Sequence, residues 1–184
     1  MDHRVRLPLI ILAACALALA SCGKKSEPPT ASSSRRSISV SSPAFANGGV
    51  LPRRFSCDGQ GTPPPLRWSG VPRGTAQFAL LMEDPDAPGG TFLHWSLFGI
   101  DPATRAYSPG ATPAGARAGR NSTGREGYTG PCPPKGDKPH RYVFTVYALG
   151  RRLALAAGAA QDEVRKATRT AAIAQGSLTA RYGR

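Results

Sequence analysis

Two stretches of this sequence hold the side chains whose types and spacing could do chemistry. The first runs from Asp84 to Trp95 and places two carboxylates, a histidine and a tryptophan around a Pro/Gly turn. The second, residues 130–142, leads from another Pro/Gly turn to a histidine and a tyrosine at the start of an apolar run. His94 and His140 each belong to one of these stretches. Because proline fixes backbone dihedrals before any ligand arrives, we expect these side chains to converge on one pocket.

Carboxylates and histidines in one place allow several kinds of chemistry. An Asp–His pair can act as a general acid and base, and two histidines with a carboxylate can ligate a metal. Asp84, His94 and His140 are the candidates for such a site. The alternative for His94 and Trp95 is structural, a histidine satisfied by backbone and packed beside a core indole. The sequence has no activated serine motif, GxGxxG, P-loop or CxxC pattern, which argues against catalysis, but the residues alone leave an enzyme or metal site open as an alternative.

Residues 1–21 have the pattern of a secretory signal peptide and are not expected to belong to the fold. Two arginines precede an apolar run from Leu7 to Ala20, which is too short to span a membrane as a stable helix. The run ends in Leu19-Ala20-Ser21-Cys22, which resembles the lipobox of bacterial lipoproteins. Acylation of Cys22 would anchor the protein to a membrane. The alternative is an ordinary cleaved signal followed by a chance cysteine.

Residues 22–37 are then a flexible tether, because their Lys, Ser, Pro, Thr and Arg cannot bury enough apolar surface to offset ordering. Residues 38–184 have the size of one ordinary domain. The chain has a formal net charge of +13, of which about +9 belongs to this domain. Such a charge favours anionic partners. The basic residues are scattered and form no long run, so we expect no nucleic-acid partner.

Short alternating or apolar runs between Pro/Gly turns predict a mostly β domain. The expected strands are Ile38–Val40, Leu66–Trp68, Gln77–Met82, Leu93–Ile100, Arg141–Leu149 and Ser177–Tyr182. We expect Gln77–Met82 to be buried on both faces beside Leu93–Ile100, and the β-branched and aromatic Arg141–Leu149 to be a central strand. One helix is expected at Gln161–Ala174, with Gly176 just past its end. These elements indicate a β-sandwich or barrel with one late helix.

Two features stay open on spacing alone. Residues 101–130 lack hydrophobic periodicity and read as a long loop, either a functional one or a plain surface excursion. Cys57 and Cys132 are the two cysteines of the expected domain. In an oxidising compartment they suggest one disulfide, and the alternative is a pair of small buried residues that never meet.

The two stretches resemble the signature of the phosphatidylethanolamine-binding protein family, most closely its bacterial Raf-kinase-inhibitor-like branch. The resemblance runs from residue 38 to 182 and rests on Asp84-Pro-Asp-Ala-Pro88, His94-Trp95, Gly130-Pro-Cys-Pro-Pro-Lys-Gly136 and His140-Arg-Tyr142. It implies a two-sheet β-sandwich with a small preformed pocket at one end. The ligand-binding candidates are Asp84, Asp86, Pro88, His94, Pro133, His140 and Tyr142. The resemblance places the other six at pocket positions, and Asp86 is also expected to support the first turn.

The resemblance also implies that Cys57 and Cys132 lie close together and form a disulfide. The family is generally regarded as non-enzymatic, so we expect no catalytic residue, no metal and no cofactor. The implied function is binding of a small anion or phospholipid headgroup at the bacterial cell envelope, with the lipid on Cys22 as anchor. The domain would face the periplasm, and the outer membrane is preferred because Gly23-Lys24 lacks the aspartate that retains many lipoproteins at the inner membrane. The alternative is a kinase- or protease-inhibitor-like protein that contacts a protein partner in the envelope through residues 101–127. One departure is that segment 119–124 lacks the aromatic residue that often follows it in the family.

Overall fold

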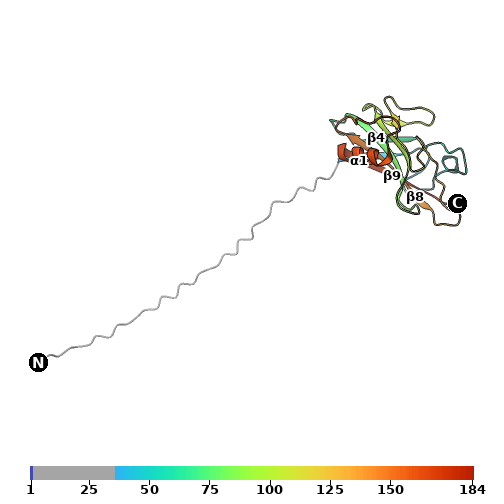
Figure 1. The fold of residues 1–184 in the computed structure, drawn as a ribbon, viewed down its shortest axis with the longest axis horizontal. Coiled ribbons are helices and arrows are strands. Elements are labelled where there is room, and N and C mark those ends of the chain that lie inside the picture. The colour runs from blue at the N-terminus through green and yellow to red at the C-terminus, as the bar shows by residue number, and fades with distance from the viewer. Residues whose placement is uncertain (2–35) are drawn as a thin grey trace. The chain divides into compact units, whose positions relative to one another are not determined.

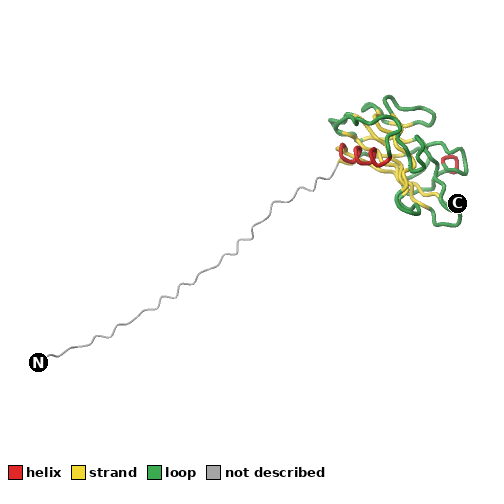
Figure 2. The backbone as a smooth tube through the Cα atoms, in the orientation of Figure 1, coloured by secondary structure: helices red, strands yellow, loops and turns green. Residues whose placement is uncertain are grey.

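Two β-sheets form the framework of the domain, and long loops and turns connect their strands (Figures 1 and 2). The computed structural model describes Met1 and residues 36–184, so the expected signal peptide, Cys22 and nearly all of the tether lie outside the described residues. The larger sheet has the order β1-β9-β8-β4-β5-β7, and the smaller has the order β2-β3-β6. The elements are β1 (Arg36–Ser37), β2 (Ser39–Ser41), the 3-10 helix η1 (Arg53–Phe55), β3 (Leu66–Ser69), β4 (Gln77–Asp84), β5 (Phe92–Ile100), β6 (Ala106–Tyr107), β7 (Arg117–Ala118), β8 (His140–Leu149), α1 (Gln161–Ala171) and β9 (Ala172–Tyr182).

Strand β4 is buried on both faces, as its continuous apolar run predicts. Phe78, Leu80 and Met82 belong to the core between the two sheets. Ala79 and Leu81 point the other way and pack in a second cluster with α1, which covers the outer face of the larger sheet (Figure 1). β4 pairs antiparallel with β5 on one side and with β8 on the other. The prediction of a two-sheet, mostly β domain with one late α-helix is confirmed.

Helix α1 is shorter than its sequence pattern indicates. It ends at Ala171, and the backbone of Ala172 is extended, with φ −67° and ψ 126°. Ala174, expected in the helix, instead lies in β9 opposite Ala148. Gly176 is also part of β9 rather than a helix cap, and a Cβ there would overlap the carbonyl oxygen of Ile38. Strand pairing and core burial therefore outweigh the helix propensity of the alanines.

The segment 101–130 contributes more to the fold than its composition indicates. It supplies β6 to the smaller sheet and β7 to the larger one. The buried Tyr107 in β6 packs edge-on against Trp95, with ring centroids 4.8 Å apart. A two-residue strand has no periodicity to detect, which is why the sequence pattern does not reveal these pairings.

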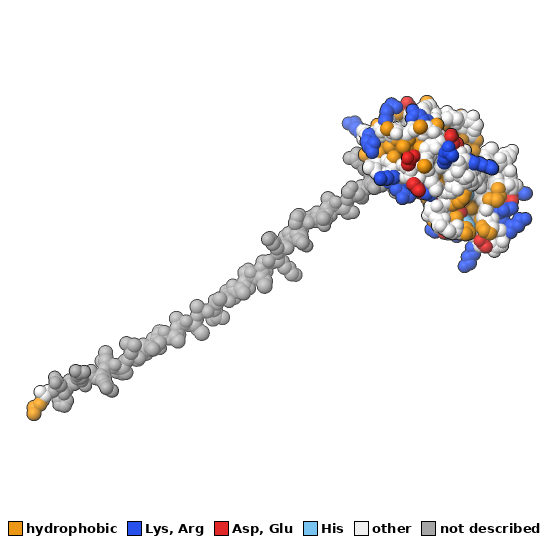
Figure 3. Space-filling model, in the orientation of Figure 1, with side chains coloured by type: hydrophobic (Ala, Val, Ile, Leu, Met, Phe, Trp, Pro, Cys, Tyr) orange, Lys and Arg blue, Asp and Glu red, His pale blue; other side chains and the backbone are white. Residues whose placement is uncertain are grey.

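Among residues 36–184, no helix is long and apolar enough to cross a membrane. Basic side chains are distributed over the visible face of the domain and do not gather in one patch (Figure 3). This distribution agrees with the scattered basic residues of the sequence.

Candidate functional site

A pocket of about 340 Å³ lies at one end of the larger sheet. Because β4 runs antiparallel to both neighbours, its last residue lies beside the first residues of β5 and β8. Such a volume suits a small ligand. The lining consists of strand-end side chains and the two loops that flank them: Asp84, Ala87, Pro88, Phe92, His94, Thr123, Thr129, Gly130, Cys132, Pro133, Pro134, His140 and Tyr142.

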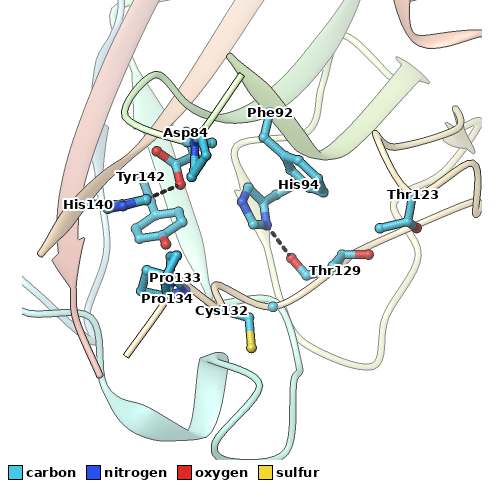
Figure 4. Close-up of a pocket in the computed structure, with 13 residues that line it drawn as sticks. Asp84, Phe92, His94, Thr123, Thr129, Cys132, Pro133, Pro134, His140 and Tyr142 are labelled. Carbon is cyan, nitrogen blue, oxygen red and sulfur yellow. Dashed lines mark hydrogen bonds and ion pairs between the residues drawn. The ribbon is translucent and has the colours of Figure 1, made fainter. Parts of the chain in front are cut away.

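Asp84 and His140 form a buried pair on one side of the pocket (Figure 4). Nδ1 of His140 lies 2.8 Å from Oδ2 of Asp84, so the ring donates its Nδ1 proton to the carboxylate. The other oxygen, Oδ1, accepts the backbone N–H of Asp86 at 2.8 Å. Both carboxylate oxygens of Asp84 thus accept a hydrogen bond, and the bond from Nδ1 fixes the ring of His140. The other ring nitrogen, Nε2, is then available to a ligand in the pocket.

His94 lies opposite this pair and is fixed by a different partner. Its Nδ1 lies 2.8 Å from the carbonyl oxygen of Thr129. A carbonyl can only accept, so Nδ1 carries the proton, and Nε2 of the neutral ring is an acceptor on the side that faces Asp84 and Tyr142 (Figure 4). Burial lowers the pKa of His94, which favours this neutral form. Trp95 packs in the core, so the structural interpretation holds for the tryptophan while His94 lines the pocket.

Tyr142 lies between the two histidines. Its ring is 5.2 Å from that of His94 and 6.5 Å from that of His140, measured between centroids. Its hydroxyl is buried near Asp84 and makes no hydrogen bond of ordinary geometry in the described part of the chain. Burial, followed by the charge of Asp84, raises the pKa of Tyr142 well above its ordinary value, so the phenol stays protonated and can donate. An unpaired buried donor at the pocket is a group that a ligand can satisfy.

The third wall of the pocket is the proline-rich segment after Gly130, which a disulfide attaches to the Cys57 turn. Cys57 and Cys132 are bonded, with Cα atoms 5.4 Å apart. The backbone N–H of Cys57 also donates to the carbonyl of Pro131 at 3.0 Å. A Cβ on Gly130 would lie 2.9 Å from the backbone carbon of Ser56, so only glycine permits this close approach. The structure therefore contains the disulfide that the sequence resemblance implies.

Asp86 is the one candidate that the structure does not place at the pocket lining. Its carboxylate accepts two hydrogen bonds from the guanidinium of Arg141, at 2.6 and 2.9 Å, and one from the backbone N–H of Arg141 at 2.8 Å. These hydrogen bonds lower the pKa of Asp86 to about 2. Asp86 and Arg141 thus join the Asp84 turn to β8 and act on the pocket through its shape.

Several pocket residues are missing from the sequence-based candidates. Phe92 could have been found, because it precedes His94 by two positions and side chains two apart on a strand share a face. Their rings are 4.6 Å apart. Thr123 and Thr129 had no such signal, since their position depends on the buried Asn121.

Asn121 shapes the wall for which the family's aromatic residue is missing. Its amide nitrogen donates to Oγ1 of Thr129 at 2.8 Å and to the carbonyl of Gly127 at 3.1 Å. Its side-chain oxygen accepts from the hydroxyl of Thr123 at 2.6 Å. One buried amide therefore holds both threonines at the pocket.

The chain is similar in sequence and in fold to proteins of a known family. Residues 41–183, which are most of the chain, match the sequence family described as phosphatidylethanolamine-binding protein. The chain belongs to the phosphatidylethanolamine-binding protein family.

Among the residues that the structure describes, no group of three His, Cys, Asp or Glu side chains is arranged to hold a metal ion.

Relatives within this family are similar over nearly the whole domain. A Mycobacterium tuberculosis protein named as lipoprotein LppC is 43% identical over 145 residues, which cover 79% of this chain and 72% of the relative. A UPF0098 protein of Aquifex aeolicus is 40% identical to this chain, and the aligned residues cover 80% of this chain and 89% of the relative. The crystal structure of Escherichia coli YbcL, titled a member of the mammalian PEBP family, has a TM-score of 0.77 at 34% identity and covers 80% of this chain and 98% of its own. The family and the fold are thereby established from both sequence and structure.

Proposed function

We propose that this protein is a non-enzymatic module that binds phosphate or a phosphorylated headgroup and is tethered to the bacterial cell envelope through a lipid on Cys22. The assignment of the ligand rests on the buried hydroxyl of Tyr142, which makes no hydrogen bond of ordinary geometry in the described part of the chain. It lies between two histidines whose Nδ1 atoms already have hydrogen-bond partners. Each ring is fixed before a ligand arrives, so little ordering is needed on binding. Membership of the phosphatidylethanolamine-binding family supports the headgroup class.

A carboxylate in an anion pocket requires an explanation. Asp84 would repel phosphate if its oxygens faced the ligand, but both accept hydrogen bonds from other groups. In this arrangement Asp84 orients His140, whose Nε2 donates to an anion when the ring carries both protons. The repulsion is then offset by the positive charge on the ring beside it.

The pocket is also expected to distinguish phosphate from sulfate. His94 presents an acceptor nitrogen, because Nδ1 donates to Thr129 and burial keeps the ring neutral. Phosphate and phosphomonoesters can retain a P–OH proton that donates to this nitrogen, whereas sulfate has no proton to give near neutral pH. A buried acceptor left without a donor costs binding energy, so sulfate should bind more weakly by about tenfold.

Isothermal titration calorimetry on the purified protein tests the proposal, with phosphate, O-phosphoethanolamine and sulfate as separate ligands. We expect phosphate and O-phosphoethanolamine to bind, and His140→Gln to weaken both by about tenfold. Arg67→Gln is the matched control, because Arg67 is an exposed cation on β3, in the other sheet. Equal affinity in wild type and His140→Gln, or no heat with either phosphate ligand, would contradict the assignment of this pocket.

The envelope tether is supported by the lipobox-like Leu19–Cys22 and by the lipoprotein name of a relative 43% identical to this chain. A periplasm-facing orientation follows if the signal peptide directs export, and the outer membrane is preferred because Gly23-Lys24 lacks an inner-membrane retention aspartate. Fractionating a bacterial host that expresses the full chain tests this part separately from the ligand.

A further inference from the structure

The Cys57–Cys132 disulfide differs from a buried structural crosslink in two ways. Both half-cystines are exposed to solvent. A cation also contacts one of the sulfurs, because Nη1 of Arg184 donates to Sγ of Cys132 over 3.1 Å. This guanidinium is held in place by Asp58, whose Oδ2 lies 3.2 Å from Nε of Arg184 and accepts the Tyr182 hydroxyl at 2.6 Å.

This arrangement makes the two sulfurs chemically unequal. In thiol–disulfide exchange a thiolate attacks one sulfur and the other leaves as a thiolate, and the better-stabilised thiolate leaves faster. A neighbouring arginine stabilises a thiolate. Arg184 touches Cys132, so the geometry favours attack on Cys57 with Cys132 as the leaving group.

The same bond holds the proline-rich wall of the pocket. Segment 130–139 contains four prolines, which have no N–H to donate, so few backbone hydrogen bonds can anchor it. The carbonyl of Pro131 accepts from Cys57, and the N–H of Gly136 donates to the carbonyl of Arg184 at 3.2 Å. Cys132, Pro133 and Pro134 line the pocket within this segment. Loss of the disulfide therefore removes a principal attachment of this wall.

We propose that Cys57–Cys132 is an exchange site for a thiol reductant and that its reduction loosens the pocket wall and weakens ligand binding. A thiolate of a vicinal dithiol attacks Sγ of Cys57, the S–S bond breaks, and its electron pair leaves on Sγ of Cys132. The second thiolate of the donor then attacks the mixed disulfide and releases Cys57. The donor dithiol is oxidised to a disulfide, and the two cysteines receive two electrons and two protons. The effect on binding rests on the proposed function, whereas the exchange chemistry does not.

The exchange step is tested on the folded full chain with dithiothreitol in the absence of denaturant, with free thiols counted by alkylation and intact mass. We expect reduction to proceed while the protein remains folded by circular dichroism. Arg184→Gln should slow it by about three- to tenfold, Arg184→Lys should restore much of the rate, and Arg181→Gln should leave it unchanged. Arg181 is the matched control because it is an exposed arginine on β9, three positions before Arg184. Reduction only under denaturing conditions, or equal rates in Arg184→Gln and wild type, overturns the exchange site.

The direction of attack has its own readout. Brief exposure to glutathione followed by rapid alkylation should place glutathione on Cys57 and the alkyl group on Cys132, as read by peptide mass mapping. The reverse labelling overturns the assignment of Cys132 as leaving group.

The coupling to the pocket is tested by hydrogen–deuterium exchange and by phosphate titration of the oxidised and reduced protein. We expect faster amide exchange at residues 130–138 on reduction, unchanged exchange in β8, and phosphate affinity lowered by about three- to tenfold. If amide hydrogen exchange at residues 130–138 is unchanged on reduction, the disulfide is not coupled to the pocket wall. This outcome does not depend on any ligand. If the oxidised protein fails to bind phosphate, the proposed function fails while the exchange results still stand. If oxidised and reduced protein bind phosphate equally, the proposed function stands and the coupling fails.

Discussion

At the scale of single residues, the pocket combines an acceptor, a donor and a second histidine that can serve as either. His94 presents a neutral nitrogen because its other nitrogen donates to Thr129. Tyr142 presents a hydroxyl that has no partner within the described residues. His140, oriented by Asp84, accepts when neutral and donates when it is doubly protonated. The proposed preference for a tetrahedral oxyanion that keeps a proton rests on these three groups.

Tyr142→Phe should have opposite effects on stability and binding. The substitution removes a buried hydroxyl that has no partner, so the free energy of unfolding should stay the same or rise by about 1 kcal/mol. It also removes a ligand donor, so phosphate affinity should fall about tenfold, or about 1.4 kcal/mol. Chemical denaturation and calorimetric titration measure the two effects.

Tyr128→Phe is the control for this pair of effects. The Tyr128 hydroxyl donates to the carbonyl of Phe55 at 2.7 Å and does not line the pocket. Its loss should lower the free energy of unfolding by about 1 kcal/mol and leave phosphate affinity unchanged. A Tyr142→Phe protein that behaves like Tyr128→Phe would show that Tyr142 is a structural residue.

O-phosphoethanolamine should bind more tightly as pH falls from 8 to 6, because its dianion gains a P–OH proton that can donate to Nε2 of His94. Burial lowers the pKa of His94, so this ring stays neutral and its Nε2 stays an acceptor. Sulfate gains no proton in this range and should show no such rise in calorimetric titration. Parallel curves for the two ligands would contradict the acceptor role of His94.

At the scale of elements, the pairing of β9 on both of its sides organises the C-terminal part of the domain. It joins β8 through a register that runs from His140↔Tyr182 to Leu149↔Ala172. On its other side it pairs parallel with β1. Gly176 lies at this junction, where the backbone of Ile38 leaves no space for a side chain. The closing strand is therefore an interior strand, and its position depends on one glycine.

Gly176→Ala should destabilise the domain by about 3 kcal/mol, because the new methyl group would force the Ile38 backbone away from β9. Thr179→Ala in the same strand is the control and should change the free energy of unfolding by less than about 1 kcal/mol. Urea denaturation of both variants measures the difference. Equal midpoints would mean that the Ile38 segment moves aside without cost.

At the scale of the whole molecule, long-range attachments hold the pocket end together. The disulfide joins positions 75 residues apart in sequence. Arg165 of α1 donates to the partly buried Glu83 of β4 at 2.8 Å, next to the pocket residue Asp84. The pocket is thus placed where the ends of strands, a helix contact and a crosslink meet, which favours a preformed site.

Replacing both Cys57 and Cys132 with serine should lower the free energy of unfolding by about 2–4 kcal/mol, because the unfolded chain regains the freedom of a long loop. Guanidinium denaturation of the variant and of the oxidised wild type measures this loss. The reduced wild type should match the variant. A variant as stable as the oxidised protein would show that the crosslink constrains only the pocket wall.

Cys22→Ala should release the protein from the membrane fraction, because the proposed acyl chains would have no other attachment site at the lipobox-like segment. Labelled fatty acid should be incorporated by the wild type and not by the variant. Ser21→Ala is the control and should keep both label and membrane association, since alanine is also small. Membrane association of Cys22→Ala would require another means of attachment.

The sequence by itself determined the six strands of three or more residues, the double burial of β4 and most of the pocket. These features follow from local patterns, since short apolar or alternating runs bounded by Pro/Gly turns are recognisable within a short window of sequence. Asp84, His94, His140 and Tyr142 were identifiable because each lies at a turn–strand boundary. The family resemblance added the disulfide, which spacing alone left open.

Only the tertiary structure decided the end of α1, the pairings of β6 and β7, and the role of Asp86. Ala172 to Ala174 have helical propensity, but pairing with β8 is a long-range interaction that no local window contains. Asp86 looked like a ligand group beside Asp84, and the structure pairs it with Arg141, 55 residues away. The unpaired hydroxyl of Tyr142 and the contact of Arg184 with Cys132 are likewise visible only in three dimensions, because both depend on which groups the fold brings within hydrogen-bonding distance.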